Sequence, residues 1–526
     1  MKRLIAGTLS AAMLAGALAG CSQGAASSGA SAETASADGK VKLTVLSTWE
    51  ITDEQPVKDE TVVGKALEEA LGIDLEITYI PEDSLSTKVT AMMSNGTLPD
   101  LVFTPIADGT SNFDTINKYG ERGYFLNLSE HMDAMPHFKA WIEDNEEIRK
   151  AATASDGNVY AFPYICDFSN IMYTTPLIRE DKLAGSDYTS DNIQTLDDLT
   201  GALKYITEST GMPSWIQREG YDEFMKMSGY LWNVESNVFY DYETDSYTHP
   251  VLLDRYREYI EWLRDLRASG VMHPDWTVMS DETWEGMLSA DQGFFTIDRM
   301  SIIGDSAFSP DFDWQPVVYP EIDGKAYLQP RQALVDTANS WAINGSLEGE
   351  KLDKALALMD YMYNPENHRM LSLGIEGETY TTEDPNTAAG IRWLVQIYGE
   401  NSDDPNAVSY LMHGIQAFTR LYREDDILSF PGQYPYVFQE QVEKIENEEG
   451  GFRPDVPALS FTEDELNTRK SVEVSMDTYF DQNIVKFIEG SRDMSEWDAF
   501  VQEVKDMGLD DVLAVYEGAY ARYQAK

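Results

Sequence analysis

The sequence predicts an α/β fold that opens with a parallel sheet and ends in a helix-rich C-terminal part. Segments rich in β-branched and apolar residues predict strands at residues 42–49, 73–79 and 98–103. Apolar residues at helical spacing lie between these strands, and Gly72 and Gly96 end the two helices. This β–α–β–α–β order is typical of parallel strands with helices packed against the sheet.

The elements that follow are mostly helical. A capping box is predicted at Thr195–Asp198, and a helix is predicted over residues 254–269. Residues 319–328 predict a hairpin, because an Asp-Gly pair lies at their centre. Further helices are predicted around residues 352–359 and from Met476 onward. Two tryptophans lie within helical apolar faces and are assigned to the core: Trp262 and Trp497.

Length and charge limit the classes of function. The chain has 526 residues and a formal net charge of −52, with 91 acidic against 39 basic residues. The length predicts two or three domains, and a hydrophobic content of 43% is enough for large cores. Nucleic-acid binding, and attachment to anionic lipid through a basic face, both require an excess of Lys and Arg. The composition therefore argues against both, while small neutral or cationic ligands stay open.

The N-terminus predicts a lipoprotein signal peptide over residues 1–20. A basic start, Lys2–Arg3, precedes an apolar stretch that is short for a transmembrane span. Residues 18–21, Leu-Ala-Gly-Cys, resemble the bacterial lipobox, which implies that Cys21 carries the lipid, including an acyl chain such as palmitate. An ordinary secretory signal is the alternative. Residues 22–40 are mostly Ser, Ala and Gly and predict a flexible tether. We expect a body at the outer face of the cell membrane, held there by the lipid anchor only.

Signatures of catalysis and of metal binding are missing from the sequence. It contains no phosphate-binding loop, nucleophile elbow, EF-hand loop or zinc-like spacing of Cys and His. Cys166 could be a nucleophile, but a lone cysteine is more often a small buried hydrophobe. The sequence therefore favours a protein that is not an enzyme and that uses no cofactor and no metal.

Aromatic residues are the more informative signal. There are 11 Trp and 29 Tyr, and several lie at predicted strand ends or in turns. The C–H faces of sugars pack on aromatic rings, and sugar hydroxyls need Asp, Asn, Glu and Arg as partners. Such a set predicts a cleft for a neutral oligosaccharide. For any single aromatic residue, the alternative is an ordinary place in the core.

Several motifs carry a resemblance that covers the whole mature chain. They are the helix end and strand entry at 92–100 (MMSNGTLPD), residues 156–163 (DGNVYAFP), the turn at 374–380 (GIEGETY), and the closing helices from Lys486 to Tyr516. In these stretches the sequence resembles the family 1 extracellular solute-binding proteins, in particular the LipO-like lipoproteins of Gram-positive bacteria. That family serves ABC importers.

The resemblance implies a two-lobed, periplasmic-binding-protein-like fold of type II, with an interlobe hinge. Three crossovers are expected, near residues 161–173, 293–300 and 336–343. The expected lobe 1 is then 41–163 plus 293–335, and the expected lobe 2 is 164–292 plus 336–526. Ligand is expected between the lobes, where strand carboxyl ends and crossovers meet. The chain has neither a permease span nor a nucleotide-binding motif, so the permease subunits of the ABC transporter are expected as separate partners.

Candidate ligand residues are chosen by their position relative to these elements. Three have structural alternatives: Asp100 could form an Asx-turn, the acid between Gly374 and Gly377 could cap its own turn, and Arg299 could pair with a neighbouring acid. The expected stacking platforms are Trp49, Tyr164, Trp232 and Trp341. The expected hydroxyl partners are Asp100, Asp167, Asn170, Asp298, Arg299, Asn339 and Glu376.

The leading hypothesis is therefore a monomeric, lipid-anchored protein that captures an oligosaccharide and delivers it to an ABC importer. One alternative is a sensor that presents its ligand to a membrane receptor kinase. Others are a binding protein for a non-sugar solute such as a peptide, and a secreted glycosidase.

Overall fold

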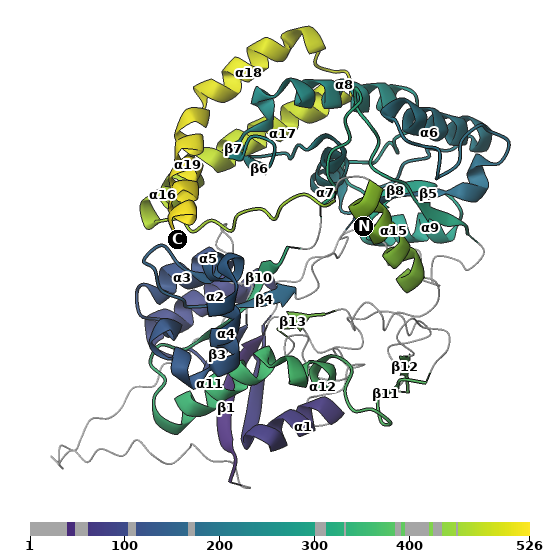
Figure 1. Cartoon of the computed structure of the whole chain (residues 1–526). Coiled ribbons are helices and arrows are strands. Elements are labelled where there is room, and N and C mark those ends of the chain that lie inside the picture. Colours follow the sequence, from purple (N-terminus) through teal and green to yellow (C-terminus); the bar gives the residue numbers. More distant parts are fainter. Residues whose placement is uncertain are drawn as a thin grey trace, which may run out of the picture.

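The computed structural model describes residues 39–47, 61–80, 82–103, 112–166, 174–299, 312–330, 333–383, 391–394, 420–423, 434–448 and 451–526. These residues form two bodies, each with its own sheet and its own core (Figure 1). We call lobe 1 the body formed by the described residues of 39–166 and 333–423. Lobe 2 is the body formed by the described residues of 174–330 and 451–526.

Lobe 1 is built on a six-stranded sheet with the order β13-β4-β10-β3-β1-β2. β1 pairs in parallel with β2 and β3, β10 runs antiparallel to β3 and β4, and β13 pairs in parallel with β4. The bounds are β1 (Val41–Ser47), β2 (Ile73–Tyr79), β3 (Leu101–Phe103), β4 (Phe162–Cys166), β10 (Val335–Ile343) and β13 (Leu421–Tyr422). The three predicted N-terminal strands and their parallel pairing are confirmed.

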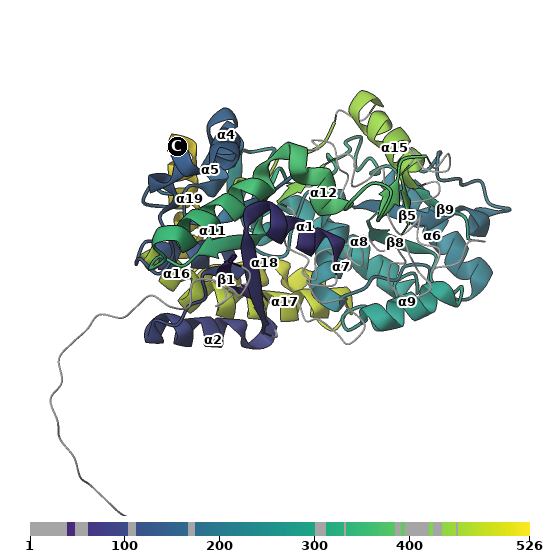
Figure 2. The ribbon, with the colours of Figure 1, turned by 90° about the horizontal axis from the view of Figure 1, so that it is seen from below.

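Helices cover the sheet of lobe 1. Figure 2 shows α11 on one side of β1 and α2 on the other. The caps of α1 explain its length, because the Thr61 hydroxyl accepts from the Gly64 N–H at 3.0 Å and Gly72 adopts a left-handed φ of 62°. The bounds are α1 (Val62–Leu71), α2 (Glu82–Asn95), α3 (Asn112–Gly120), α4 (Pro136–Asp144), α5 (Glu146–Ala152), α11 (Gly349–Tyr363) and α12 (His368–Ser372).

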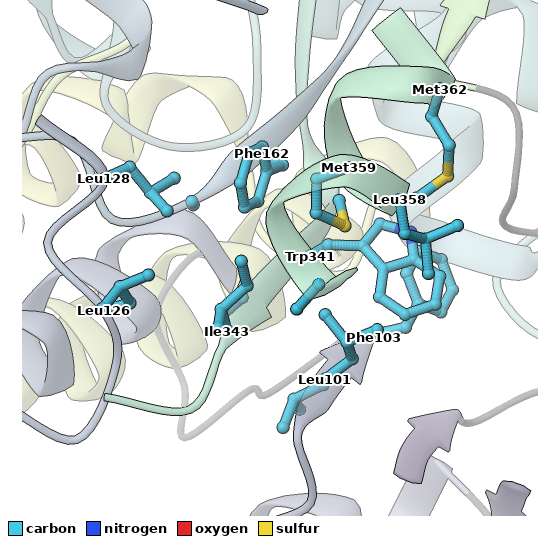
Figure 3. Close-up of a cluster of buried hydrophobic side chains, with 14 of the residues drawn as sticks. Leu101, Phe103, Leu126, Leu128, Phe162, Trp341, Ile343, Leu358, Met359 and Met362 are labelled. Atoms are coloured by element: carbon cyan, nitrogen blue, oxygen red, sulfur yellow. The ribbon is translucent and has the colours of Figure 1, made fainter. Parts of the chain in front are cut away.

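The core of lobe 1 lies between this sheet and the helices that cover it, and α11 contributes a large part. Figure 3 shows the ring of Trp341, on β10, beside Phe103 of β3 and next to Leu358 and Met362 of α11. The Trp341 and Phe103 ring centroids are 5.1 Å apart, and both side chains are fully buried. The strands and α11 are therefore joined through large side chains.

Lobe 2 has a three-stranded sheet with the order β8-β5-β9, in which β5 runs antiparallel to both neighbours. The strands are β5 (Thr175–Arg179), β8 (Phe295–Asp298) and β9 (Trp314–Pro316), with a separate hairpin of β6 (Phe239–Asp241) and β7 (Ser246–Thr248). Its helices are α6 (Leu196–Thr210), α7 (Gly220–Gly229), α8 (Asp254–Ala268), α9 (Asp281–Ser289), α16 (Glu463–Thr468), α17 (Val474–Ile488), α18 (Trp497–Asp506) and α19 (Leu509–Ala525).

Most local predictions for lobe 2 are confirmed. Thr195 caps α6 in a reciprocal capping box with Asp198, and α8 covers the predicted helix at 254–269. Helices α17 to α19 confirm the helix-rich C-terminal part. The hairpin at 319–328 is formed only at its turn, where Ile322 and Lys325 exchange both backbone hydrogen bonds.

The predicted division of the chain into lobes is wrong in two places. Residues 293–335 were expected in lobe 1, but β8 and β9 pair with β5 in the sheet of lobe 2. Residues from 336 onward were expected in lobe 2, but β10, α11 and β13 belong to the sheet and core of lobe 1. The chain therefore crosses between β4 and β5, between β9 and β10, and again before residue 451.

The lobes also touch where α19 meets α5. The Lys526 ammonium donates to the Thr153 carbonyl, and Arg149 donates to the Lys526 carbonyl at 2.8 Å. An open hollow at this junction is lined by Asp144, Asn145, Glu146, Glu147, Lys150 and Tyr523. A further helix, α15 (Tyr434–Glu448), and a short hairpin of β11 (Tyr380–Thr381) and β12 (Arg392–Trp393) complete the described α-helices and β-strands. None of the described helices is both long and apolar enough to span a bilayer.

Candidate functional site

The sheet of lobe 1 presents one edge from which the chain crosses to lobe 2. β1, β2, β3, β4 and β13 all run in the same direction, so their carboxyl ends share this edge with the amino end of β10. The first crossover leaves this edge after Cys166, and the second arrives there just before Val335. In open α/β sheets, ligands bind beyond the carboxyl ends of the strands. We therefore take this edge as one wall of the candidate site.

A cluster of aromatic and charged side chains lies at this wall. The rings of Tyr164 on β4 and Tyr422 on β13 have centroids 6.4 Å apart. The guanidinium carbon of Arg420 lies 5.1 Å from the Tyr164 ring and 5.6 Å from the Phe103 ring. Arg420 is 2% exposed, and burial lowers its pKa from the ordinary value, against the opposing influence of Asp336. This combination of rings and charges is suited to a polar ligand with flat apolar faces.

The opposite wall comes from the sheet of lobe 2. β5 begins at Thr175, directly after the first crossover, and Thr175 is paired with Asp298 at the carboxyl end of β8. Both oxygens of Asp298 accept from Arg218, at 2.8 and 3.1 Å, and Oδ1 also accepts from the Arg299 N–H at 2.7 Å. Burial is the largest single influence and lowers the pKa of Arg218. The charge and hydrogen bonds of Asp298, together with the charges of Glu219 and Asp281, outweigh it, so the net pKa is raised.

Two of the expected stacking platforms are core residues, and we correct that interpretation. Trp341 is 0% exposed within the core of lobe 1, and Trp232 is 3% exposed within the core of lobe 2. Trp232 packs against Tyr259 and Trp262, with ring centroids 6.0 and 6.1 Å away. A ring enclosed in this way has no face left for a sugar.

Asp100 is also corrected, because it lies at the amino end of β3, the end opposite the candidate wall. Its Oδ2 accepts from the Thr44 N–H at 2.8 Å and from the Thr44 hydroxyl at 2.9 Å. The same oxygen lies 3.0 Å from the Lys351 ammonium. The carboxylate therefore joins β3 to β1 and α11, a structural role that differs from the local Asx-turn given as its alternative.

The remaining candidates have mixed outcomes. Tyr164 and Arg299 lie at the two walls, and Arg299 is exposed. The Glu376 carboxylate accepts from the Thr382 hydroxyl at 2.7 Å, within its own turn. Trp49, Asp167, Asn170 and the side chain of Asn339 lie outside the described residues, as does Cys21. Arg218, Arg420 and Tyr422 were missed. Arg420 and Tyr422 lie at β13, which is too short to be recognised by periodicity, and Arg218 lies in a loop before α7.

A row of acidic residues outside these walls makes the stability of lobe 2 depend on pH. Asp477 and Asp481 lie in α17, and Glu473 is its N-cap, so the three acids follow one another at four-residue spacing. Glu473 accepts from Tyr516 and from Arg469, each at 2.7 Å, and Asp481 accepts from Tyr221 at 2.9 Å. The buried Oδ1 of Asp477 has no partner among the described groups. Burial, and to a smaller extent the negative charges of Glu473 and Asp481, raises the pKa of Asp477 to about 7. The positive charge of Arg469 acts in the opposite direction.

We expect Asp477→Asn to stabilise the protein at pH 8 by about 1–2 kcal/mol, and to change stability little at pH 4. The folded-state pKa lies above the unfolded value, so stability is lost as pH rises from about 4 through 7. The amide removes that loss because it carries no charge. Urea unfolding at both pH values measures this, with Asp498→Asn, whose side chain is 95% exposed, as the control. An equal effect of Asp477→Asn at both pH values would contradict it.

Metal ligands are not gathered anywhere in the described part of the chain. No group of three or more His, Cys, Asp and Glu side chains there could hold a metal ion.

Known proteins with similar sequences are solute-binding proteins and a lipoprotein. The model of the family described as "Bacterial extracellular solute-binding protein" matches residues 62–379, which is more than half of the chain. The fructooligosaccharide ABC transporter substrate-binding protein FusA of Streptococcus pneumoniae serotype 4 is 20% identical over 520 residues, covering 89% of this chain and 88% of FusA. Lipoprotein LipO of Bacillus subtilis is 23% identical over 409 residues, covering 73% and 74%.

Solved structures of two-lobed binding proteins share the fold. Alginate-binding protein AlgQ2 without calcium ion superposes with a TM-score of 0.70 at 19% identity, covering 93% of this chain and 99% of AlgQ2. An extracellular solute-binding protein from Bifidobacterium longum subsp. infantis gives a TM-score of 0.72 at 16% identity, covering 93% and 100%. These likenesses confirm the predicted two-lobed α/β fold. The chain belongs to the bacterial extracellular solute-binding proteins, as its motifs and the family match together establish.

Proposed function

We propose that this protein binds an oligosaccharide between its two lobes and delivers it to the permease of an ABC importer. The observation that carries the proposal is the pair of sheet edges joined by the crossovers. One edge presents the half-buried rings of Tyr164 and Tyr422, with the buried Arg420 against Tyr164, and the other presents Arg218, which is bonded to the buried Asp298. Rings that can stack on sugar faces, next to charged groups that can bond hydroxyls, are the two requirements of carbohydrate binding.

The relatives support a sugar as the ligand class. FusA is described as a fructooligosaccharide-binding protein, and a structure of it contains kestose. A further relative, YtcQ of Bacillus subtilis, is described as binding polygalacturonan and rhamnogalacturonan. These relatives differ in whether their sugars are neutral or acidic, so the ligand of this chain is proposed only as an oligosaccharide.

The anchor and the partners are part of the same proposal. Cys21 follows a lipobox-like sequence, and LipO is described as a lipoprotein. A lipid on Cys21, followed by the tether at 22–40, would keep the body beside a permease while leaving the lobes free to close. We propose a monomer outside the cell that is not an enzyme and that uses no cofactor.

Thermal shift followed by calorimetry against a glycan panel tests the proposal. The panel contains kestose, Man5GlcNAc, alginate oligosaccharides and oligogalacturonate, with a tripeptide mixture as the non-sugar arm. A specific sugar at 100 times its Kd should stabilise the folded protein by about 2.7 kcal/mol. A shift with peptides and none with any sugar would overturn the oligosaccharide assignment. Appearance of cleaved glycan during the incubation would overturn the assignment as a non-enzyme.

A further inference from the structure

The two lobes are joined by polar contacts at the end of α19, through residues that belong to neither wall of the candidate site. The Thr153 carbonyl, which follows α5 in lobe 1, accepts from the Lys526 ammonium and from the Ser460 hydroxyl of lobe 2, the latter at 3.1 Å. Arg149 of α5 donates to the carbonyl of Lys526 at 2.8 Å. Figures 1 and 2 both show the end of α19, marked C, beside α5.

Two further contacts extend this surface. Arg122, which follows α3 in lobe 1, forms an ion pair with Glu463, the first residue of α16. The Lys150 ammonium of α5 lies 5.6 Å from the ring centroid of Tyr523 on α19. We call this whole set of contacts, from the Thr153 carbonyl to the Tyr523 ring, the α5–α19 junction.

Each half of the junction is fixed within its own lobe. In lobe 2, Arg522 donates to the Glu465 carboxylate at 2.8 Å and to the Ser460 carbonyl at 3.1 Å, so α19, α16 and the residue before them are tied together. In lobe 1, both the N–H and the hydroxyl of Thr153 donate to the Arg149 carbonyl, at 3.1 and 2.6 Å. A force between the two halves is therefore passed from one lobe to the other.

The junction adjoins the third crossover of the chain. Residues 451–461 lead into it, and on the way the Asp455 carboxylate accepts from the Leu334 N–H at 2.9 Å, just before β10. Points close to the connecting segments of a hinge move least when two lobes rotate, so contacts there can persist during closure. The open hollow beside the junction is lined by both lobes, which leaves them free to turn about it.

We propose that the α5–α19 junction is a fixed pivot, which restrains the relative orientation of the lobes in the free protein and sets the axis about which they close. A narrower range of orientations leaves less conformational entropy to be lost when a ligand closes the lobes. The junction therefore raises ligand affinity without touching the ligand. This effect on affinity rests on the proposed function, whereas the restraint is a property of the free protein.

Removing two cations from the junction tests the pivot. The double variant Arg122→Met with Lys526→Met eliminates the ion pair to Glu463 and the bond from the ammonium to Thr153. Exposed ion pairs contribute little to stability, so its Tm should stay within about 2 °C of wild type. The Kd for the panel sugar that binds wild type most tightly should rise about threefold.

Nitroxide labels measure the orientation of the lobes directly. Glu69→Cys on α1 and Glu285→Cys on α9 place one label at an exposed position of each lobe. Cys21→Ser removes one native cysteine, and the other, Cys166, is buried. In the free double variant, the distribution of distances between the labels should be about 1.5 times as broad as in the labelled wild type or broader.

A matched control removes the same charges from ion pairs within one lobe. Lys139 pairs with Asp133 at 2.7 Å in lobe 1, and Arg257 pairs with Glu261 at 3.1 Å in lobe 2. The double variant Lys139→Met with Arg257→Met should match wild type in both the distance distribution and the Kd.

The outcomes separate the pivot from the proposed function. An unchanged distance distribution in the junction variant would refute the pivot, whether or not a sugar binds. Equal broadening in the control would refute it as well, because loss of charge would then be the cause. Broadening with an unchanged Kd would overturn the role in affinity. If wild type binds no sugar of the panel, the proposed function fails, and the distance distribution still decides the pivot.

Discussion

Replacing Trp341 with alanine is expected to destabilise lobe 1 by about 3–5 kcal/mol, the largest effect that we predict for a single side chain. The residue is fully buried on β10, opposite Phe103 of β3 and Phe162 of β4 in the sheet register. Its ring also lies beside Leu358 and Met362 of α11 (Figure 3). Removal leaves a cavity where the central strand meets both the neighbouring strands and the helix.

Urea unfolding of the Trp341→Ala and Trp341→Phe variants measures this effect. The phenylalanine variant fills part of the cavity and should lose only about 1–2 kcal/mol. Val278→Ala serves as the control, because Val278 is 74% exposed and should change stability by less than about 0.5 kcal/mol. The folded Trp341→Phe variant should bind its sugar as wild type does. A stable variant that has lost sugar binding would restore Trp341 as a stacking platform.

The start of the fold could be predicted because its signals are local. The strands β1, β2 and β3 and the helix α1 are each specified by periodicity within about ten residues and by caps such as Thr61 and Gly72. The same holds for the capping box of α6. The parallel pairing then follows from the order of the elements alone.

The lobe boundaries could not be predicted, because no local signal tells which sheet a strand joins. β8 and β9 are short, and their partner β5 is more than a hundred residues away from each of them. β10 returns to lobe 1 after a long excursion through lobe 2, and β13 joins the same sheet about eighty residues later. Only the long-range pairing reveals where the crossovers lie.

The site was predicted less well, because the core and a sugar cleft use the same residue types. Trp232 and Trp341 are fully enclosed, whereas Tyr164 lies at the edge, and sequence position alone does not separate these cases. Asp100 was misplaced because a strand entry marks the amino end of a strand, while ligands approach the carboxyl end. Tyr422 lies in the two-residue strand β13, and Arg420 lies directly before it, so neither belongs to a periodic pattern.

Replacing Arg218 with methionine is expected to destabilise lobe 2 by about 3 kcal/mol. The side chain of Asp298 is 5% exposed, and Arg218 donates to both of its oxygens. Without Arg218, the only hydrogen-bond donor left to the carboxylate among the described residues is the Arg299 N–H. A buried charge without its counter-ion costs more than the pair itself contributes, so most of the loss comes from the carboxylate left behind.

Replacing the other partner of the pair, by Asp298→Asn, should lower the free energy of unfolding by less, about 1–2 kcal/mol. Arg218 keeps Glu219 at 3.4 Å and Asp281 at 3.8 Å, and it stays 5.5 Å from the ring of Trp284. The double variant Arg218→Met with Asp298→Asn should lose less than the sum of the two single variants, because no buried carboxylate remains. Additive losses in chemical unfolding would contradict a coupled pair.

Sugar affinity should also fall more in Arg218→Met than in Lys226→Met. Asp298, the partner of Arg218, is paired with Thr175 where the first crossover enters lobe 2, whereas Lys226→Met only removes an exposed cation of α7.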